Sequence, residues 1–172
     1  DKLLGKELLG LMVNKLYLVE MADFKIEWYL SIMLDRLTKQ PIIIFSAEGG
    51  MEIEETAKQK PEAIKKIVID PMIGVQDYMA RYLLSSTHQD LMYVKQLDAL
   101  LKKLYKCFMD YDCMLTEINP LVVQEDDTLL ALDGKVDIDD SALYRLPDVT
   151  AWREELPEED LVKEAREFNF LY

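Results

Sequence analysis

The sequence predicts an α+β fold, in which strands and helices occupy separate stretches of one chain. Apolar and β-branched residues dominate residues 15–45, helical spacing dominates residues 51–109, and two strand-like runs follow within residues 113–137. The order of strands, helices, strands and a last helix is typical of an α+β fold or of a mixed α/β sandwich. With 172 residues, the chain is long enough for one domain with its own core.

The first strands are expected as a meander. Three runs favour β structure, and the polar residues between the second and third predict a turn at Leu37–Gln40. The runs are Lys15–Glu20, Ile26–Asp35 and Pro41–Phe45. Their near-continuous apolar character predicts a sheet that is covered on both faces.

The middle of the chain is mainly helical. The paired glycines of Ser46–Gly50 predict a loop. Short helices are expected at Met51–Lys58 and from Pro61, a short strand at Ile67–Ile69, and longer helices at Val75–Leu84 and Leu91–Met109. The last of these carries apolar residues at the three-four spacing of one stripe, which predicts a helix packed on the core.

Two strands are expected around a polar turn, Cys113–Val123 before it and Thr128–Asp137 after it. Past Asp140 the pattern predicts short helices, the last an amphipathic helix from Pro157 to Phe168.

Three oxygen-bearing side chains are expected to converge on this hairpin. Glu117 and Asn119 share one face because side chains alternate across a strand. If the hairpin turns about Asp126, Asn119 lies opposite Asp133, and the Cβ atoms of opposed residues are about 5 Å apart.

Such a set favours a hard divalent cation. Two neighbouring carboxylates are costly to bury unless a cation neutralises them. Oxygen ligands without His or Cys suit Mg²⁺ or Mn²⁺ rather than zinc or copper, and Mg²⁺ leaves coordination positions for substrate phosphates. Two other interpretations stay open: Pro120 could make these residues simple edge-strand features, and Asp133-Gly134 could be a turn.

Composition excludes several classes of function. The formal net charge of -13 argues against a nucleic-acid binder and against docking on anionic membranes, since both need clustered Lys and Arg. It is compatible with nucleotide binding, because Mg²⁺ brings positive charge to the phosphates. The two cysteines are too few for a disulfide scaffold and are expected as reduced thiols in a cytoplasmic protein. No apolar run reaches membrane-spanning length, and the start does not read as a signal peptide.

Several motifs together resemble one family. They are LGKELL, LVEMADFKIEWYLSIMLDR, SAEGGMEIEETA, TEINPLVV and ALDGKVDIDDSALYRLPDV. In this order and spacing they are similar to the β subunit of succinate–CoA ligase, and they cover most of the chain. Malate–CoA ligase, ATP-citrate lyase and ADP-forming acetate–CoA ligase share them.

The resemblance implies an ATP-grasp fold, with a mixed or antiparallel sheet flanked by helices and nucleotide held between two α+β lobes. Residues 1–172 are expected to form part of that fold, its C-terminal lobe with part of the rest. The upstream phosphate-binding lobe and the downstream CoA-ligase domain are expected to be absent from this chain. The family also has a longer loop where this chain has only Gly10-Leu11-Met12.

The resemblance also implies roles for individual residues. Asn119 and Asp133 match the Mg²⁺ ligands, and Glu117 matches a catalytic residue that meets the phosphohistidine loop of the partner subunit. The phosphorylated His belongs to that partner, so His88 is interpreted as a loop residue. Three further acidic residues match the nucleotide contacts, namely Glu20, Asp23 and Glu27.

The implied activity is formation of succinyl-CoA from succinate and CoA with ATP or GTP. The α subunit would carry the phosphohistidine and the CoA site, in the cytoplasm or, in a eukaryote, in the mitochondrial matrix. This chain alone is expected to be inactive. The alternatives are a related acid–CoA ligase and a noncatalytic assembly fragment.

Overall fold

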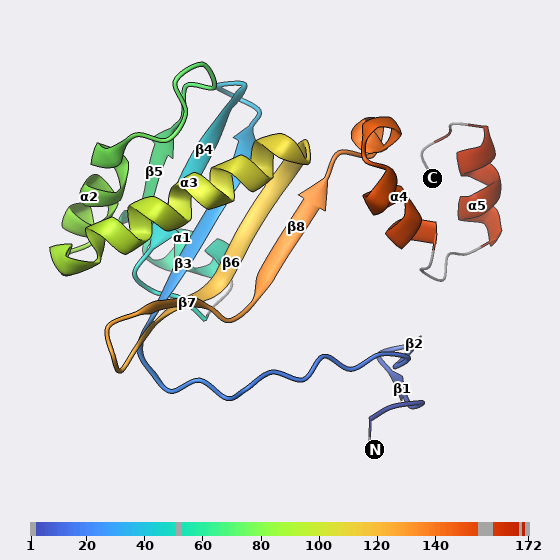
Figure 1. Ribbon diagram of the computed structural model, residues 1–172, viewed down its shortest axis with the longest axis horizontal. Helices are drawn as coiled ribbons and strands as arrows, with labels where there is room; N and C mark the ends of the chain where they lie inside the picture. Colours follow the sequence, from blue (N-terminus) through green and yellow to red (C-terminus); the bar gives the residue numbers. More distant parts are fainter. Residues whose placement is uncertain (1–2, 51–52, 155–159, 169, 171–172) are drawn as a thin grey trace.

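An antiparallel six-stranded sheet forms the centre of the computed structural model, which describes all residues except 1–2, 51–52, 155–159, 169 and 171–172 (Figure 1). The strand order is β5-β4-β3-β6-β7, and β8 also pairs with β6. The strands are β3 (Phe24–Asp35), β4 (Gln40–Ser46), β5 (Ile64–Val68), β6 (Cys113–Gln124), β7 (Leu129–Ala131) and β8 (Gly134–Ile138). The α+β prediction is therefore confirmed.

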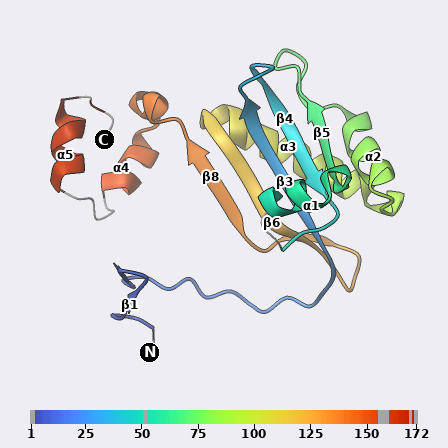
Figure 2. The same ribbon diagram turned by 180° about the vertical axis from the view of Figure 1, so that it is seen from behind.

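Helices cover the sheet unequally. The long α2 and α3 lie on one face, and the short α1 lies on the other, as Figures 1 and 2 show from opposite sides. The α-helices are α1 (Ile53–Gln59), α2 (Asp77–Ser86), α3 (Val94–Asp110), α4 (Pro147–Glu154) and α5 (Asp160–Glu167). Short 3-10 helices stand at Pro61–Ala63, Leu91–Tyr93 and Asp140–Arg145. In the described part of the chain, no helix combines the length and the apolar character needed to cross a membrane.

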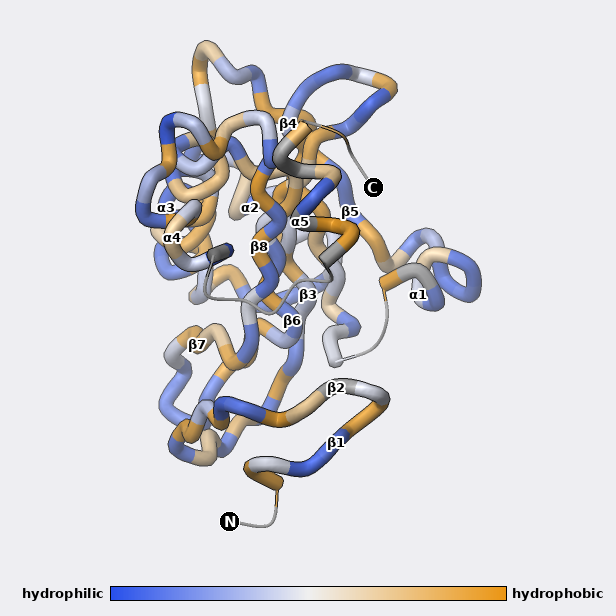
Figure 3. Tube along the Cα trace, turned by 90° about the vertical axis from the view of Figure 1, so that its right-hand side faces the viewer, coloured by the Kyte–Doolittle hydropathy of each residue, from blue (hydrophilic) through white to orange (hydrophobic). Residues whose placement is uncertain are grey.

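The main core lies between the sheet and the pair α2 and α3. Trp28 is completely buried there, with its ring edge-on to Phe45 and Tyr93 at centroid distances of 5.5 Å. The indole N–H of Trp28 donates to Oε1 of Gln89 at 3.1 Å, so the polar atom of the ring also has a partner. Hydrophobic segments of the strands and of α2 gather in this region (Figure 3).

A second, smaller cluster lies on the opposite face. Tyr29, Ile42 and Ile44 are buried there, with Ile53 of α1 and Ile64 of β5 packed against them. The prediction of a sheet covered on both faces is therefore confirmed for β3 and β4.

The predicted strand at Lys15–Glu20 is wrong. Residues 14–23 have no helix or strand and run as an extended arm, and most of their side chains are exposed. The apolar side chains of Tyr17 and Leu18 are 92% and 89% exposed. A strand needs a neighbour for its backbone hydrogen bonds, and the described residues supply none here. From residue 3 to the start of β3, the regular structure is the small hairpin of β1 (Glu7–Leu8) and β2 (Leu11–Met12).

The other predicted elements form with small shifts. Thr128–Asp137, expected as one strand, is divided into β7 and β8 at residues 132–133. Asp133 Oδ1 accepts from the N–H of Gly134 at 2.8 Å, a local bond of the kind that competes with regular strand structure. The last helix begins at Asp160, and the predicted start at Pro157 lies outside the described residues.

A group of hydrogen bonds to Asp127 links the turn between β6 and β7 to other parts of the domain. Asp127 Oδ1 accepts from Lys25 Nζ at 2.5 Å and from the Tyr93 hydroxyl at 2.8 Å, and the Asp127 carbonyl accepts from Gln96 at 2.9 Å. The hydrogen bonds from Lys25 and Tyr93 lower the pKa of the Asp127 carboxyl below its usual range. The turn is thereby held against β3 and α3.

Asp127→Asn is expected to lower the melting temperature at neutral pH. A carboxyl whose pKa is depressed by folding stabilises the fold above its unfolded pKa of about 3.9, and this contribution disappears as the pH falls through the folded pKa. The difference between wild type and variant should therefore shrink on acidification below about pH 4. Thermal melts over a pH series measure this. Glu125→Gln removes the same charge from the same turn and serves as the control, and an equal loss in both variants would contradict the prediction.

Candidate functional site

The hairpin register places Asn119 opposite Asp133, as the sequence predicts. The N–H of Asn119 donates to the carbonyl of Asp133 at 3.3 Å, and the N–H of Leu132 donates to the carbonyl of Pro120 at 3.2 Å. The same register continues on both sides, with Leu121 opposite Ala131 in β7 and Ile118 opposite Gly134 in β8. The polar residues of the two strands therefore lie side by side.

A β-bulge in β6 places Asn119 on the face away from α2 and α3. Leu121 pairs with Trp28 and Ile118 pairs with Leu30, so Asn119 and Pro120 together oppose the single residue Tyr29. The extra residue allows both Ile118 and Leu121 to enter the main core. The Asn119–Pro120 peptide bond is cis.

A glycine loop lies directly against this part of the sheet. The N–H of Gly49 donates to the carbonyl of Glu27 at 3.1 Å, and the N–H of Gly50 donates to Oδ1 of Asn119 at 3.1 Å. A Cβ at Gly50 would stand 2.2 Å from Oε2 of Glu27, and its φ of +73° also favours glycine. The two glycines thus bring the loop backbone close to Glu27 and Asn119.

Glu117 lies two positions before Asn119 in β6 and is hydrogen-bonded to Tyr29. Its Oε2 accepts a hydrogen bond from the Tyr29 hydroxyl at 2.7 Å. Glu117 is half-buried, and the exposed Lys135 lies opposite it on β8. We call the sheet face that carries Glu27, Tyr29, Glu117 and Asn119 the site face.

The residues present fit a hard divalent cation. Asn119 Oδ1, the Asp133 carboxylate and the Glu117 carboxylate form an oxygen-only set, and each oxygen has more than one lone pair. Within the described residues there is no group of three or more His, Cys, Asp and Glu that could hold a metal. The set predicted from the sequence, two carboxylates and one amide, is of the kind that suits an ion that completes its shell with waters and phosphate oxygens.

The structure does not gather the predicted nucleotide residues in one place. Glu27 lies in β3 beside the glycine loop, where its carbonyl accepts from Gly49. Glu20 and Asp23 lie on the exposed arm of residues 14–23. His88 is an exposed loop residue after α2 with a φ of +57°, which confirms its interpretation as a loop residue.

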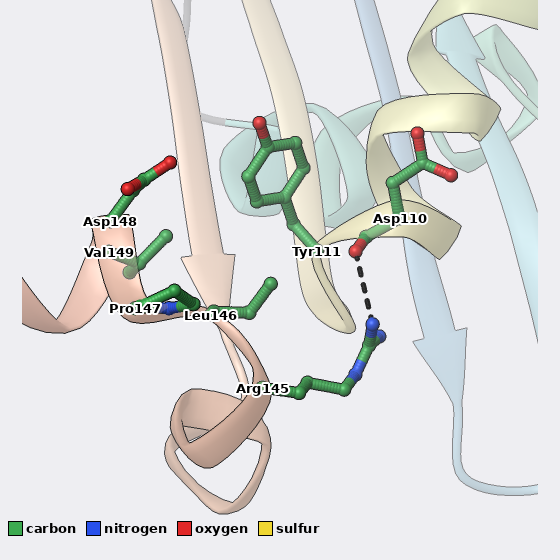
Figure 4. A pocket seen from close by; sticks show the side chains of 7 residues that line it. All are labelled: Asp110, Tyr111, Arg145, Leu146, Pro147, Asp148 and Val149. Atoms are coloured by element: carbon green, nitrogen blue, oxygen red, sulfur yellow. Dashed lines mark hydrogen bonds between the residues drawn. The ribbon is translucent and has the colours of Figure 1, made fainter.

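Two pockets lie away from the site face. One of about 340 Å³ is formed where α3 ends and α4 begins, and there the Arg145 guanidinium donates to the Asp110 carbonyl at 3.4 Å (Figure 4). The other, of about 470 Å³, lies between the segments around Lys60 and His88. Neither is lined by the predicted site residues.

Tyr29, Gly49 and Gly50 are neighbours of the site that sequence reasoning missed. The sequence pattern identifies the glycine pair only as part of a loop, although SAEGG begins at Ser46, the last residue of β4, which pairs with β3. Tyr29 stands two positions after Glu27 and therefore shares its face, a signal that was available in the sequence.

Several curated proteins resemble this chain in sequence over nearly its whole length. The chain is 41% identical over 170 residues to the succinate–CoA ligase [ADP-forming] subunit beta of Bacteroides thetaiotaomicron, covering 99% of this chain and 45% of that protein. It is 44% identical to the same subunit of Desulfatibacillum aliphaticivorans, covering 95% and 42%, and 41% identical to that of Bacillus subtilis, covering 93% and 43%. The chain thus spans less than half the length of these curated relatives.

Solved structures and a family model agree on the fold. The ATP citrate lyase from Methanothrix soehngenii, in complex with citrate and coenzyme A, superposes with a TM-score of 0.60 at 18% identity, over 92% of this chain and 35% of that one. The acetyl-coenzyme A synthetase 1 of Ca. Korarchaeum cryptofilum gives 0.52 at 11% identity, over 69% and 56%. The ATP-grasp domain model matches residues 1–123. The chain therefore belongs to the ATP-grasp domain family.

Proposed function

We propose that this chain is the nucleotide- and Mg²⁺-binding part of the β subunit of an ADP-forming succinate–CoA ligase. The ligase would form succinyl-CoA from succinate and CoA, with ATP or GTP converted to the diphosphate and phosphate. The proposal is supported by the identity of over 40% to succinate–CoA ligase β subunits. A cytoplasmic location accompanies it.

The observation that carries the proposal is the register of the β6 hairpin. It brings the half-buried Asn119 opposite the exposed Asp133, two positions from the half-buried Glu117. In this sequence, the bulge at residues 119–120 keeps the polar residues of β6 on one face of the sheet while Ile118 and Leu121 face the core.

In this proposal each polar residue has a separate task. Asn119 and Asp133 hold Mg²⁺, which when bound offsets the charge of the phosphate oxygens. Glu27 accepts hydrogen bonds from ribose hydroxyls or amino groups of the nucleotide, and Glu20 and Asp23 extend this contact along the arm. Glu117 meets the loop that carries the phosphorylated histidine of the partner α subunit.

The chain's contribution to the reaction is orientation and electrostatics. The bond between the γ-phosphorus and its bridging oxygen breaks and leaves the diphosphate, and a phosphorus–nitrogen bond forms to the partner's histidine. Succinate then takes the phosphoryl group, and the CoA thiol displaces phosphate from the acyl phosphate. The histidine and the CoA site both belong to the α subunit in this proposal.

Assay of the complete ligase against a panel of acids tests the function. Succinate should support CoA-dependent release of ADP and phosphate more efficiently than malate, citrate or acetate. If another acid is preferred, that acid replaces succinate as the proposed substrate. If no acid in the panel supports CoA-dependent release of ADP and phosphate, the proposal is overturned.

Mg²⁺-nucleotide is expected to raise the melting temperature of the complete ligase. A ligand that binds only the folded state at 100 times its Kd stabilises it by about 2.7 kcal/mol. The shift should disappear with EDTA and in an Asn119→Ala/Asp133→Ala variant. An equal shift in wild type and variant would show that the nucleotide binds without these two residues.

A further inference from the structure

Tyr29 is a buried aromatic residue whose polar end points at the site. Only 3% of its surface is exposed, and its ring packs in the cluster with Ile42 and Ile44. Ile53 of α1 and Ile64 of β5 close this cluster from outside. Packing on several sides leaves the ring little freedom to turn, so the position of its hydroxyl is fixed by the fold.

The hydroxyl reaches across the sheet to Glu117. Ser31, not Tyr29, is the β3 residue directly opposite Glu117, so the Tyr29 ring extends diagonally to the carboxylate. The O–H donates to Oε2 at 2.7 Å, the usual length for a hydroxyl–oxygen bond. The bond joins residues 88 positions apart in the chain, so it depends on the tertiary fold.

We propose that Tyr29 is a positioning residue that fixes the Glu117 carboxylate for phosphoryl transfer to the partner's histidine. The inference rests on the proposed function of Glu117. A glutamate side chain has several rotatable bonds, and ordering it at the moment of reaction costs free energy. Because the Tyr29 hydroxyl holds one oxygen of the Glu117 carboxylate, the side chain is already ordered when the protein has folded. The other carboxylate oxygen can then face the partner subunit.

The chemical character of the donor supports this role. A phenol is a neutral donor, so it orients the carboxylate without cancelling its negative charge, whereas a lysine in its place would form an ion pair. Lys135, on the neighbouring strand β8, lies opposite Glu117 but is exposed and carries a flexible stem. The rigid, buried Tyr29 is the better orienting group.

Tyr29→Phe in the complete ligase tests the inference. The variant keeps the ring and its packing and removes only the hydroxyl. We expect kcat for phosphorylation of the partner's histidine to fall roughly 10- to 100-fold, with the nucleotide KM unchanged. Tyr105→Phe is the matched control, because the buried Tyr105 hydroxyl has no hydrogen-bond partner among the described residues, and this variant should keep wild-type kcat.

A double-mutant cycle with Glu117→Ala separates positioning from a structural role. If Tyr29 acts through Glu117, Tyr29→Phe should have no further effect on kcat in the Glu117→Ala background. Equal fold-losses in both backgrounds, or a Tyr29→Phe variant with wild-type kcat, would overturn the inference. Wild-type activity of Glu117→Ala itself would instead overturn the proposed role of Glu117.

Discussion

Asp133→Ala in the complete ligase is expected to reduce phosphorylation of the partner's histidine by at least about 100-fold. The substitution removes the one carboxylate that the hairpin register places opposite Asn119. In the proposed function the cation that offsets phosphate charge would lose one of its two ligands on this chain. Labelling with radioactive ATP measures the phosphorylated subunit directly.

The fold should tolerate this change. Asp133 is exposed, and within the described part of the chain its side chain hydrogen-bonds to the next N–H, that of Gly134. The melting temperature of the variant should therefore stay near that of wild type. Asp137→Ala removes an exposed carboxylate from the adjoining strand β8 and should leave labelling unchanged. Normal labelling of the Asp133→Ala complex would disprove the metal assignment.

Gly49→Ala is expected to destabilise the domain by about 1–3 kcal/mol and to impair the site. A Cβ at Gly49 would lie 2.6 Å from the carbonyl carbon and oxygen of Trp28 and 2.7 Å from its nitrogen. Backbone atoms in the centre of β3 cannot move away as a flexible side chain can, so the loop must be displaced instead. Displacement would break the hydrogen bond from Gly50 to Asn119.

Urea denaturation of the chain and nucleotide binding by the complete ligase measure the two effects. Gly134→Ala is the matched control, because a Cβ there would meet only the Glu117 carbonyl at an ordinary 3.6 Å. Unchanged stability of Gly49→Ala would mean that the loop can move away from β3 without cost.

The sequence was sufficient to predict the hairpin and its register. Its two strands are apolar and joined by a short polar turn, so the distance from the turn determined which residues are opposed. The Lys15–Glu20 strand could not be excluded in this way. Its residues have high strand propensity, but a strand also needs a pairing partner, and propensity does not report on that.

The supporting residues of the site could be predicted only in part. The position of Tyr29 on the face of Glu27 follows from alternation, but its hydrogen bond to Glu117 depends on the register between β3 and β6. That register changes at Asn119–Pro120, and a local pattern of apolar residues does not reveal where two distant strands shift by one position. The close approach of Gly49 to the Trp28 backbone likewise depends on the tertiary fold and not on a local sequence pattern.

The extra residue in β6 also constrains how this segment can change length over evolution. Deletion of one residue between Ile118 and Leu121 would leave these two side chains on one face by plain alternation, but it would shift the pairing of β6 with β7 by one residue relative to its pairing with β8. We therefore expect relatives to retain the number of residues in this stretch.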